Sequence, residues 1–145
     1  MRALALDLGS RRVGVAVGDD GAGLAFPREA LRRAPAGVGG RAEDHRRLAA
    51  LAAEEQVDVV VVGLPRSLDG SLGPAARAAL AEVEDLRAVL PVPVEVHDER
   101  LTTVAAERAL AGAGVRSRER RRSVDSAAAA VLLESWFATR AGEAG

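Results

Sequence analysis

The stretch RALALDLGSRRVGVAVG, residues 2–18, predicts two strands that fold back on each other. Residues 2–8 and 13–18 are mostly apolar, and residues 9–12 between them carry the glycine and polar side chains typical of a turn. Residues 24–26 predict a short third strand that ends before Pro27. The chain therefore begins as an antiparallel sheet, with Asp7 near the end of its first strand.

The middle of the chain alternates helices with strands. Leu48, Leu51 and Ala52 at helical spacing predict a helix over residues 41–55. The β-branched run 57–62 then predicts a parallel strand that is buried on both faces. A second helix follows Pro74, and alternating valines over residues 92–96 predict another strand. The expected buried face of that second helix is Leu80, Val83, Leu86 and Leu90.

The last third of the chain is expected to be helical. Thr102 or Thr103 can cap a helix that ends near Gly112, and Ser123 or Asp125 can cap a final alanine-rich helix that packs on the sheet. Residues 34–40, with one proline and three glycines, predict a mobile loop suited to a lid. We expect one domain over residues 1–140 and a flexible tail over residues 141–145.

Composition excludes several classes of site. The chain has no cysteine, so it forms neither a disulfide framework nor a thiolate metal site. Only two phenylalanines and one tryptophan are present, which is too few for a base-stacking platform. The first apolar run is too short for a signal peptide, and no later segment approaches the length of a membrane span. We therefore expect a cytoplasmic protein.

Three acidic residues stand where predicted strands or helices begin or end. Asp7 closes the first strand, Glu99 follows the valine-rich strand, and Asp125 begins the last helix. Clustered carboxylates repel one another unless a hard cation such as Mg²⁺ neutralises them, and such clusters are typical of phosphoryl-transfer sites. Taken singly, Asp7 is also suited to capping the turn and Asp125 to capping a helix.

Four segments carry a more specific signal: DLGSRRVGVAVGD, VVGLPRSLDGS, DERLTT and VDSAAAAVLLES. In this order they resemble the motifs of the YqgF family, which is similar to bacterial Holliday-junction resolvases. The resemblance implies an α/β ribonuclease H-like fold with a central mixed five-stranded sheet flanked by helices. It also implies a metal-dependent nuclease that matures the 5′ end of pre-16S rRNA in ribosome biogenesis.

The family's catalytic acids carry over to Asp7, Glu99 and Asp125, which the resemblance implies as ligands of Mg²⁺ or Mn²⁺. Asp98 and Glu99 are adjacent, so an extended backbone points them to opposite sides, and the family match favours Glu99. Whether Asp98 also binds metal stays open. For His97 we favour a structural hydrogen bond over a catalytic role.

Two positions depart from the family pattern, and one histidine is expected at the surface. Gly18 stands where the family often has serine, and Leu86 where an aromatic residue is common. His45 lies on a predicted helix rich in arginine and glutamate, and we expect it to be exposed. Neither departure touches the proposed metal ligands.

Arginines supply the candidate contacts to nucleic acid. Net charge is −1, but all 20 basic residues are arginine and five of them crowd into residues 116–122. For the arginine run at residues 116–122, the alternative to binding nucleic acid is a solvated charged face. For residues 63–73, which include Arg66 and Ser67, the alternative is a plain crossover loop. The expected phosphate-binding set is Arg11, Arg12, Arg66, Ser67, Arg100, Arg116, Arg118, Arg120, Arg121 and Arg122.

Three functions remain open at this point. Pre-rRNA cleavage is favoured, with the ribosome as a further partner of a monomer or weak homodimer. Cleavage of branched DNA by a Holliday junction resolvase is the second, and it would favour a two-fold dimer because symmetrical incision needs paired cuts. A non-catalytic adaptor that binds nucleic acid or the ribosome is the third. The sequence leaves open the mode of cleavage and the sequence preference.

Overall fold

The computed structural model describes residues 1–35, 37, 39–65, 69–98 and 117–144, and in the last range it describes the side chains of residues 126–142. Five strands and three helices lie in these ranges. They are β1 Arg2–Leu8, β2 Arg12–Asp19, β3 Leu24–Arg32, α1 Gly40–Glu54, β4 Val59–Leu64, α2 Pro74–Val89, β5 Val94–Asp98 and α4 Ser117–Ala144.

The strands form one mixed sheet in the order β3-β2-β1-β4-β5. β1 pairs antiparallel with β2 and parallel with β4, and β4 pairs parallel with β5. Leu6 fixes the register at the centre, since it lies opposite Val15 on one side and Val62 on the other. The predicted hairpin, the buried parallel strand and the five-stranded α/β architecture are therefore confirmed.

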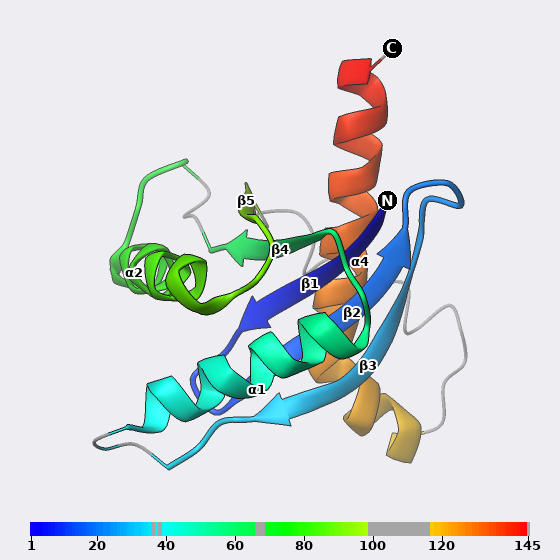
Figure 1. The fold of residues 1–145 in the computed structure, drawn as a ribbon. Coiled ribbons are helices and arrows are strands. Elements are labelled where there is room, and N and C mark those ends of the chain that lie inside the picture. The colour runs from blue at the N-terminus through cyan, green and yellow to red at the C-terminus, as the bar shows by residue number, and fades with distance from the viewer. Residues whose placement is uncertain (36, 38, 66–68, 99–116, 145) are drawn as a thin grey trace.

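Each face of the sheet buries its own apolar cluster, because successive side chains of a strand point to opposite faces. The first cluster joins Leu4 and Leu6 of β1 to Leu48 of α1 and Leu86 of α2. The second joins Ala3, Ala5 and Val61 to the side chains of α4, among them Leu132, Leu133, Trp136 and Phe137. Figure 1 shows this layering, with α1 and α2 on one side of the sheet and α4 on the other.

The third strand is longer than predicted. β3 continues through Pro27, which lies opposite Ala16, and ends at Arg32. Because β3 is the outer strand of the sheet among the described residues, the missing N–H of proline is tolerated at its far edge. The expectation that this strand ends before Pro27 is wrong for that reason.

The last helix also differs from the expectation. α4 begins at Ser117, so Asp125 lies inside the helix and does not cap it. The intervening residues are mostly arginine and glutamate, which are good helix formers and extend the helix upstream. α4 continues to Ala144, through the stretch predicted as a flexible tail. The helix expected over residues 102–112 lies outside the described residues.

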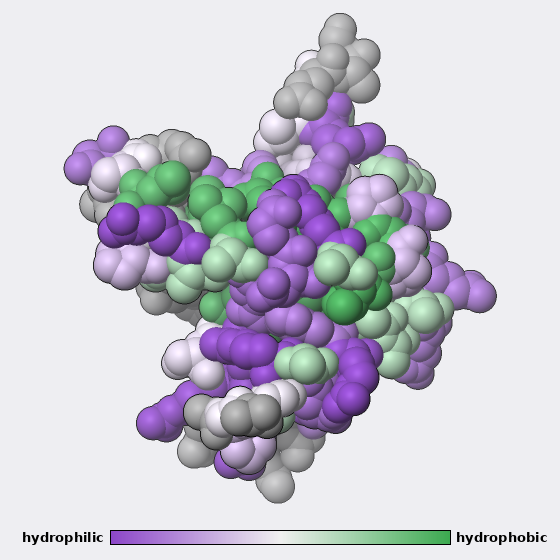
Figure 2. Space-filling model, turned by 60° about the vertical axis from the view of Figure 1, so that its left-hand side comes forward, coloured by the Kyte–Doolittle hydropathy of each residue, from purple (hydrophilic) through white to green (hydrophobic). Residues whose placement is uncertain are grey.

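The surface is mixed in character. Figure 2, with the side that carries α2 brought forward, shows hydrophilic surface interrupted by apolar patches. In the part of the chain that the structure describes, the exposed large apolar side chains are Met1, Leu24, Phe26, Leu72 and Val89. No helix within those described ranges has the length and apolar character that crossing a membrane requires.

Gly18 is required by close packing rather than by backbone conformation. A Cβ atom at this position would lie 2.3 Å from the Leu24 carbonyl oxygen and 3.0 Å from the Phe137 ring. We expect Gly18→Ala to lower the free energy of unfolding by about 1–3 kcal/mol, because the added methyl group overpacks the junction of β2, β3 and α4.

Urea unfolding of Gly18→Ala beside Gly142→Ala measures this effect. Gly142 lies in α4 with open space around its Cβ position, so alanine there should leave stability unchanged or raise it slightly. Equal stability of the two variants would contradict the packing argument.

Candidate active site

Asp7 lies at the carboxyl end of the central strand. Strand alternation places Asp7 on the same face as Ala3 and Ala5, which pack against α4. Asp7 is partly buried. The neighbouring parallel strands β4 and β5 end at the same edge, where Leu64 lies opposite Asp98. This edge is where an open α/β sheet commonly presents its functional side chains.

The two faces of β5 separate Asp98 from its neighbours. Val94 and Val96 pack toward the cluster that contains α1 and α2, so Asp98, in phase with them, lies on that face. Glu95 and His97 lie on the opposite face, where Glu95 accepts a hydrogen bond from Trp136 Nε1 at 3.1 Å. Asp7 shares this second face. Asp98 and Asp7 therefore lie on opposite faces of the sheet. In the sequence, Glu99 is in phase with Glu95 and His97.

His97 makes the structural hydrogen bond that the sequence favours. Its Nε2 lies 2.9 Å from Ser135 Oγ on α4, which ties β5 to the helix. Burial lowers the pKa of the His97 imidazole below its ordinary value, and the nearby carboxylate of Asp98 opposes this only in part. His97 is therefore a neutral hydrogen-bonding group at neutral pH.

Ser126 anchors α4 beside Asp7. Its side chain is fully buried, and its Oγ accepts a hydrogen bond of 3.1 Å from the backbone N–H of Val15. The pairing of β2 with β3 shifts register between Val13 and Val15, and such an irregularity disrupts the ladder locally. Gly14, the residue of β2 just before Val15, lies opposite Asp7. This hydrogen bond therefore holds the turn of α4 that contains residue 125 at the level of Asp7.

Several predicted site residues fall outside this geometry. Arg11, in the turn that follows Asp7, and Arg12, the first residue of β2, are both exposed, as a role in phosphate binding requires. Glu99, Arg66, Ser67, Arg100 and Arg116 lie outside the described residues, and Asp125, Arg118, Arg120, Arg121 and Arg122 lie on α4 with side chains outside them. Among the side chains that are described, no three of histidine, aspartate and glutamate gather closely enough to hold a metal ion.

A buried ionic cluster that the sequence analysis missed lies next to the turn. Arg33, just after β3, donates two hydrogen bonds to the Glu82 carboxylate, at 2.6 and 3.0 Å, and one of 3.4 Å to Asp44. His45 Nε2 lies 2.8 Å from Glu82, and because a carboxylate only accepts, this nitrogen carries the hydrogen. His45 is buried, so the expectation of an exposed side chain is wrong.

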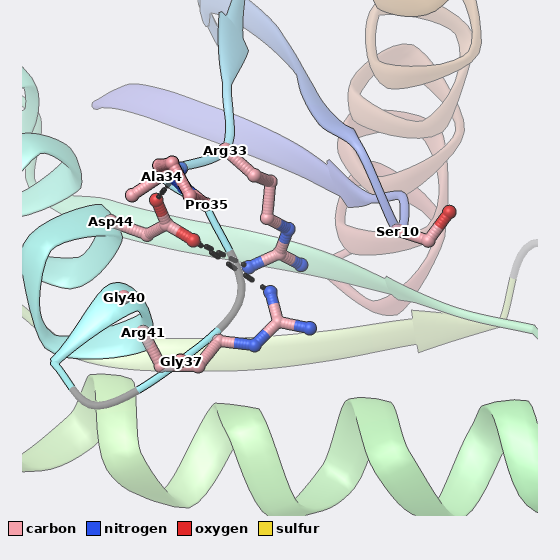
Figure 3. A pocket seen from close by; sticks show the side chains of 8 residues that line it. All are labelled: Ser10, Arg33, Ala34, Pro35, Gly37, Gly40, Arg41 and Asp44. Carbon is pink, nitrogen blue, oxygen red and sulfur yellow. Dashed lines mark hydrogen bonds and ion pairs between the residues drawn. The ribbon is translucent and has the colours of Figure 1, made fainter.

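A signal for this cluster does exist in the sequence. Glu82 is three residues from Ala79 and four from Leu86, so it falls on the buried stripe of α2. His45 and Asp44 likewise fall in phase with Leu48 on α1. A charged residue in the buried phase of a helix indicates a partner inside the fold. Figure 3 shows the guanidinium groups of Arg33 and Arg41 converging on Asp44 at a pocket of about 250 Å³.

Comparison with known proteins identifies the family of this chain. The RuvX family, described as Holliday junction resolvase, matches residues 1–139. The chain belongs to the RuvX family. RuvX and YqgF are two names of one family, so the resemblance drawn from the four motifs is confirmed.

Relatives of this RuvX-family chain share nearly its whole length. A protein of Mycobacterium tuberculosis (strain ATCC 25618 / H37Rv), named "Putative pre-16S rRNA nuclease", is 48% identical over 140 residues, 96% of this chain and 79% of that protein. A relative of the same name from Mycolicibacterium paratuberculosis (strain ATCC BAA-968 / K-10) is 47% identical over 140 residues, 96% of this chain and 81% of that protein.

Solved structures show the same fold at low sequence identity. RuvC of Thermus thermophilus in complex with a Holliday junction substrate superposes with a TM-score of 0.65 at 20% identity, covering 98% of this chain and 96% of that one. A second Thermus thermophilus RuvC structure gives a TM-score of 0.58 at 20% identity, with 98% and 97% covered. The ribonuclease H-like fold expected from the sequence is confirmed.

The Ser126 hydrogen bond generates a stability prediction. Ser126→Ala leaves the Val15 N–H buried without its acceptor, and we expect the free energy of unfolding to fall by about 1–3 kcal/mol. Thr139→Ala is the control, because Thr139 on the same helix is exposed and its Oγ1 donates to the Ser135 carbonyl one helical turn away. Chemical unfolding of both variants measures the difference, and an equally small loss in each would refute the anchoring role.

The ionic cluster generates a pH prediction. Burial alone would raise the pKa of the Glu82 carboxyl, but hydrogen bonds from Arg33 and His45 outweigh it and hold this pKa below its ordinary value of 4.5. The folded state therefore favours the ionised form, so the stabilisation is complete above pH 4.5 and is lost as pH falls through the folded pKa.

The stability of the native chain and of Glu82→Gln, measured by urea unfolding across acidic pH, isolates this contribution. We expect the native chain's advantage to be largest above pH 4.5 and to shrink at more acidic pH. A difference that stays constant throughout would show that Glu82 is not preferentially ionised in the folded protein.

Proposed function

We propose that this chain is a metal-dependent nuclease that hydrolyses phosphodiester bonds, with the 5′ end of pre-16S rRNA as its substrate. Membership of the RuvX family over residues 1–139, with relatives that carry the rRNA nuclease name, is the observation that carries the proposal. The position of Asp7 at the carboxyl edge of the sheet, facing α4, supports it. The fold alone would be insufficient, because one fold hosts many activities.

The proposed ligands of Mg²⁺ or Mn²⁺ are Asp7, Glu99 and Asp125. Carboxylate oxygens are the ligands that these hard cations prefer, and the chain has no cysteine to favour a softer metal. Two features of the structure fit this set. Asp7 lies on the face of the sheet that α4 covers. The hydrogen bond of Ser126 holds the turn of α4 that contains residue 125 at the level of Asp7.

Bound divalent ions would supply Lewis-acid stabilisation of the phosphoryl group and a lowered pKa for the attacking water. The chain's own residues position the substrate. Arg11, in the turn after Asp7, and Arg12, at the start of β2, are exposed, and their guanidinium groups can donate hydrogen bonds to phosphate oxygens on either side of the scissile bond. Such contacts hold the backbone of a nucleic acid without reading its bases, which agrees with the scarcity of aromatic residues.

A second candidate is cleavage of four-way DNA junctions. The description of the family as Holliday junction resolvase favours it, and the RuvC structure that shares this fold holds such a junction. This activity would require a two-fold dimer with two active sites, because paired cuts resolve a junction. The two candidates share the same chemistry and differ in the substrate and in the assembly.

The deciding experiment incubates the protein with Mg²⁺ or Mn²⁺ and two substrates in parallel, a 5′-extended 16S rRNA precursor fragment and a four-way DNA junction. We expect cleavage of the RNA and at least a hundredfold loss in Asp7→Asn, because the amide lacks the charge of the carboxylate. Asp85→Asn is the matched control, since Asp85 is exposed on α2 and the same isosteric change there should leave cleavage unaltered.

Other outcomes of this experiment are equally informative. Full activity in Asp7→Asn would reject the proposed site. Cutting of the junction alone would identify a resolvase, and sedimentation of the active species would then show a dimer. Binding of either nucleic acid without metal-dependent cutting would favour a non-catalytic adaptor.

A further inference from the structure

Arg33 holds the turn that follows Asp7 through both its backbone and its side chain. Its Nε donates a 2.8 Å hydrogen bond to the carbonyl oxygen of Gly9, and its backbone N–H donates one of 2.8 Å to the carbonyl of Arg11. The remaining guanidinium nitrogens contact Glu82 and Asp44. One buried side chain thus ties the turn to α1 and α2 at the same time.

The turn itself has little freedom to adjust. The Gly9 N–H lies 3.1 Å from the carbonyl of Asp7 and 3.0 Å from that of Arg12. A Cβ atom at Gly9 would come within 2.5 Å of the Arg12 carbonyl oxygen, so the two sides of the turn are in close contact. A shift of the Gly9 carbonyl is therefore transmitted to the backbone of Asp7, two residues away.

The electrostatics of the cluster favour a role in geometry. Arg33 and Glu82 expose only 5% and 11% of their side chains, so both charges are removed from water. Burying an ion pair costs desolvation that its attraction roughly offsets, so the pair as a whole contributes little net stability, whereas loss of one partner's charge leaves the other charge buried without its partner. The planar guanidinium, in contrast, presents its donors in a fixed fork, which specifies the relative positions of all its acceptors.

We propose that Arg33 is a positioning residue for catalysis: it fixes the Gly9 turn, and with it the carboxylate of Asp7, in the orientation that phosphodiester hydrolysis requires. This inference rests on the proposed function, in which Asp7 belongs to the active site. Arg33 acts through Gly9 and has no contact with the substrate in this role. The cluster of Asp44, His45 and Glu82 serves to hold Arg33 itself.

Arg41 provides a matched control on the same carboxylates. It lies 3.7 Å from Asp44 and 3.8 Å from Glu82, but 58% of its side chain is exposed. Its contacts with these two carboxylates are longer than hydrogen bonds. Arg33 and Arg41 thus carry the same charge against the same partners, and of the two it is Arg33 that donates to Gly9.

The test compares Arg33→Lys with Arg41→Lys. Lysine keeps the charge, but its single ammonium group cannot serve Gly9 and both Glu82 oxygens together. We expect Arg33→Lys to raise amide hydrogen exchange at Gly9–Arg12 at least tenfold in the metal-free protein. We also expect its kcat to fall at least tenfold, with KM within about threefold of the native value, because orientation contributes to the barrier rather than to binding. Arg41→Lys should leave exchange and kcat within twofold.

A second pair of variants covers the case in which Arg33→Lys does not fold. Arg33→Gln with Glu82→Gln removes one positive and one negative charge together, and so leaves no additional unpaired charge. Arg41→Gln with Glu82→Gln makes the same change in charge and keeps the Arg33 contact with Gly9. We expect the turn to loosen and kcat to fall in the first double variant, and to a much smaller extent in the second.

The outcomes separate this inference from the proposed function. Unchanged exchange at the turn in Arg33→Lys, or loosened exchange with full kcat, overturns the positioning role. Equal losses in the two double variants overturn it as well, since charge alone would then explain them. Absence of any cleavage by the native chain counts against the proposed function, and exchange in the metal-free protein then decides by itself whether Arg33 holds the turn.

Discussion

The backbone ladder on both sides of β1 is the constraint on which the rest of the structure depends. β1 pairs antiparallel with β2 over its whole length and parallel with β4 over four residues. Its hydrogen-bonding groups thus find partners on both sides, and its side chains are enclosed by helices on both faces. Asp7 is the point at which this enclosed strand reaches the edge of the sheet.

The two faces of the sheet take different parts in building that edge. Asp7, Glu95 and His97 lie on the face toward α4, where Trp136 and Ser135 of α4 form hydrogen bonds with Glu95 and His97. The opposite face is packed by aliphatic side chains of α1 and α2, with the ionic cluster at its border. The proposed metal ligand Asp7 therefore lies on one side of the sheet, and Arg33, in the ionic cluster on the other side, is hydrogen-bonded to the turn that follows Asp7.

Much of the fold was predictable because it depends on local pattern. Alternation in residues 2–18 indicates the hairpin, and the β-branched run in β4 indicates a strand buried on both faces. Two errors in the bounds of secondary-structure elements came from applying one local rule by itself. Pro27 is accommodated because β3 is an edge strand, and a short polar residue such as Asp125 at a plausible cap position does not stop a helix whose upstream residues favour helix.

The sequence by itself determined the α/β class, the order of strands and helices, the four motifs and the placement of Asp7 at a strand end, because each depends on residues close together in the chain. Only the tertiary structure decided which groups meet. Ser126 bonds to Val15 across 111 residues and Arg33 to Glu82 across 49, and no local pattern specifies such pairs. Because these groups are buried, loss of either hydrogen bond would leave a polar group without water or a partner, which costs free energy.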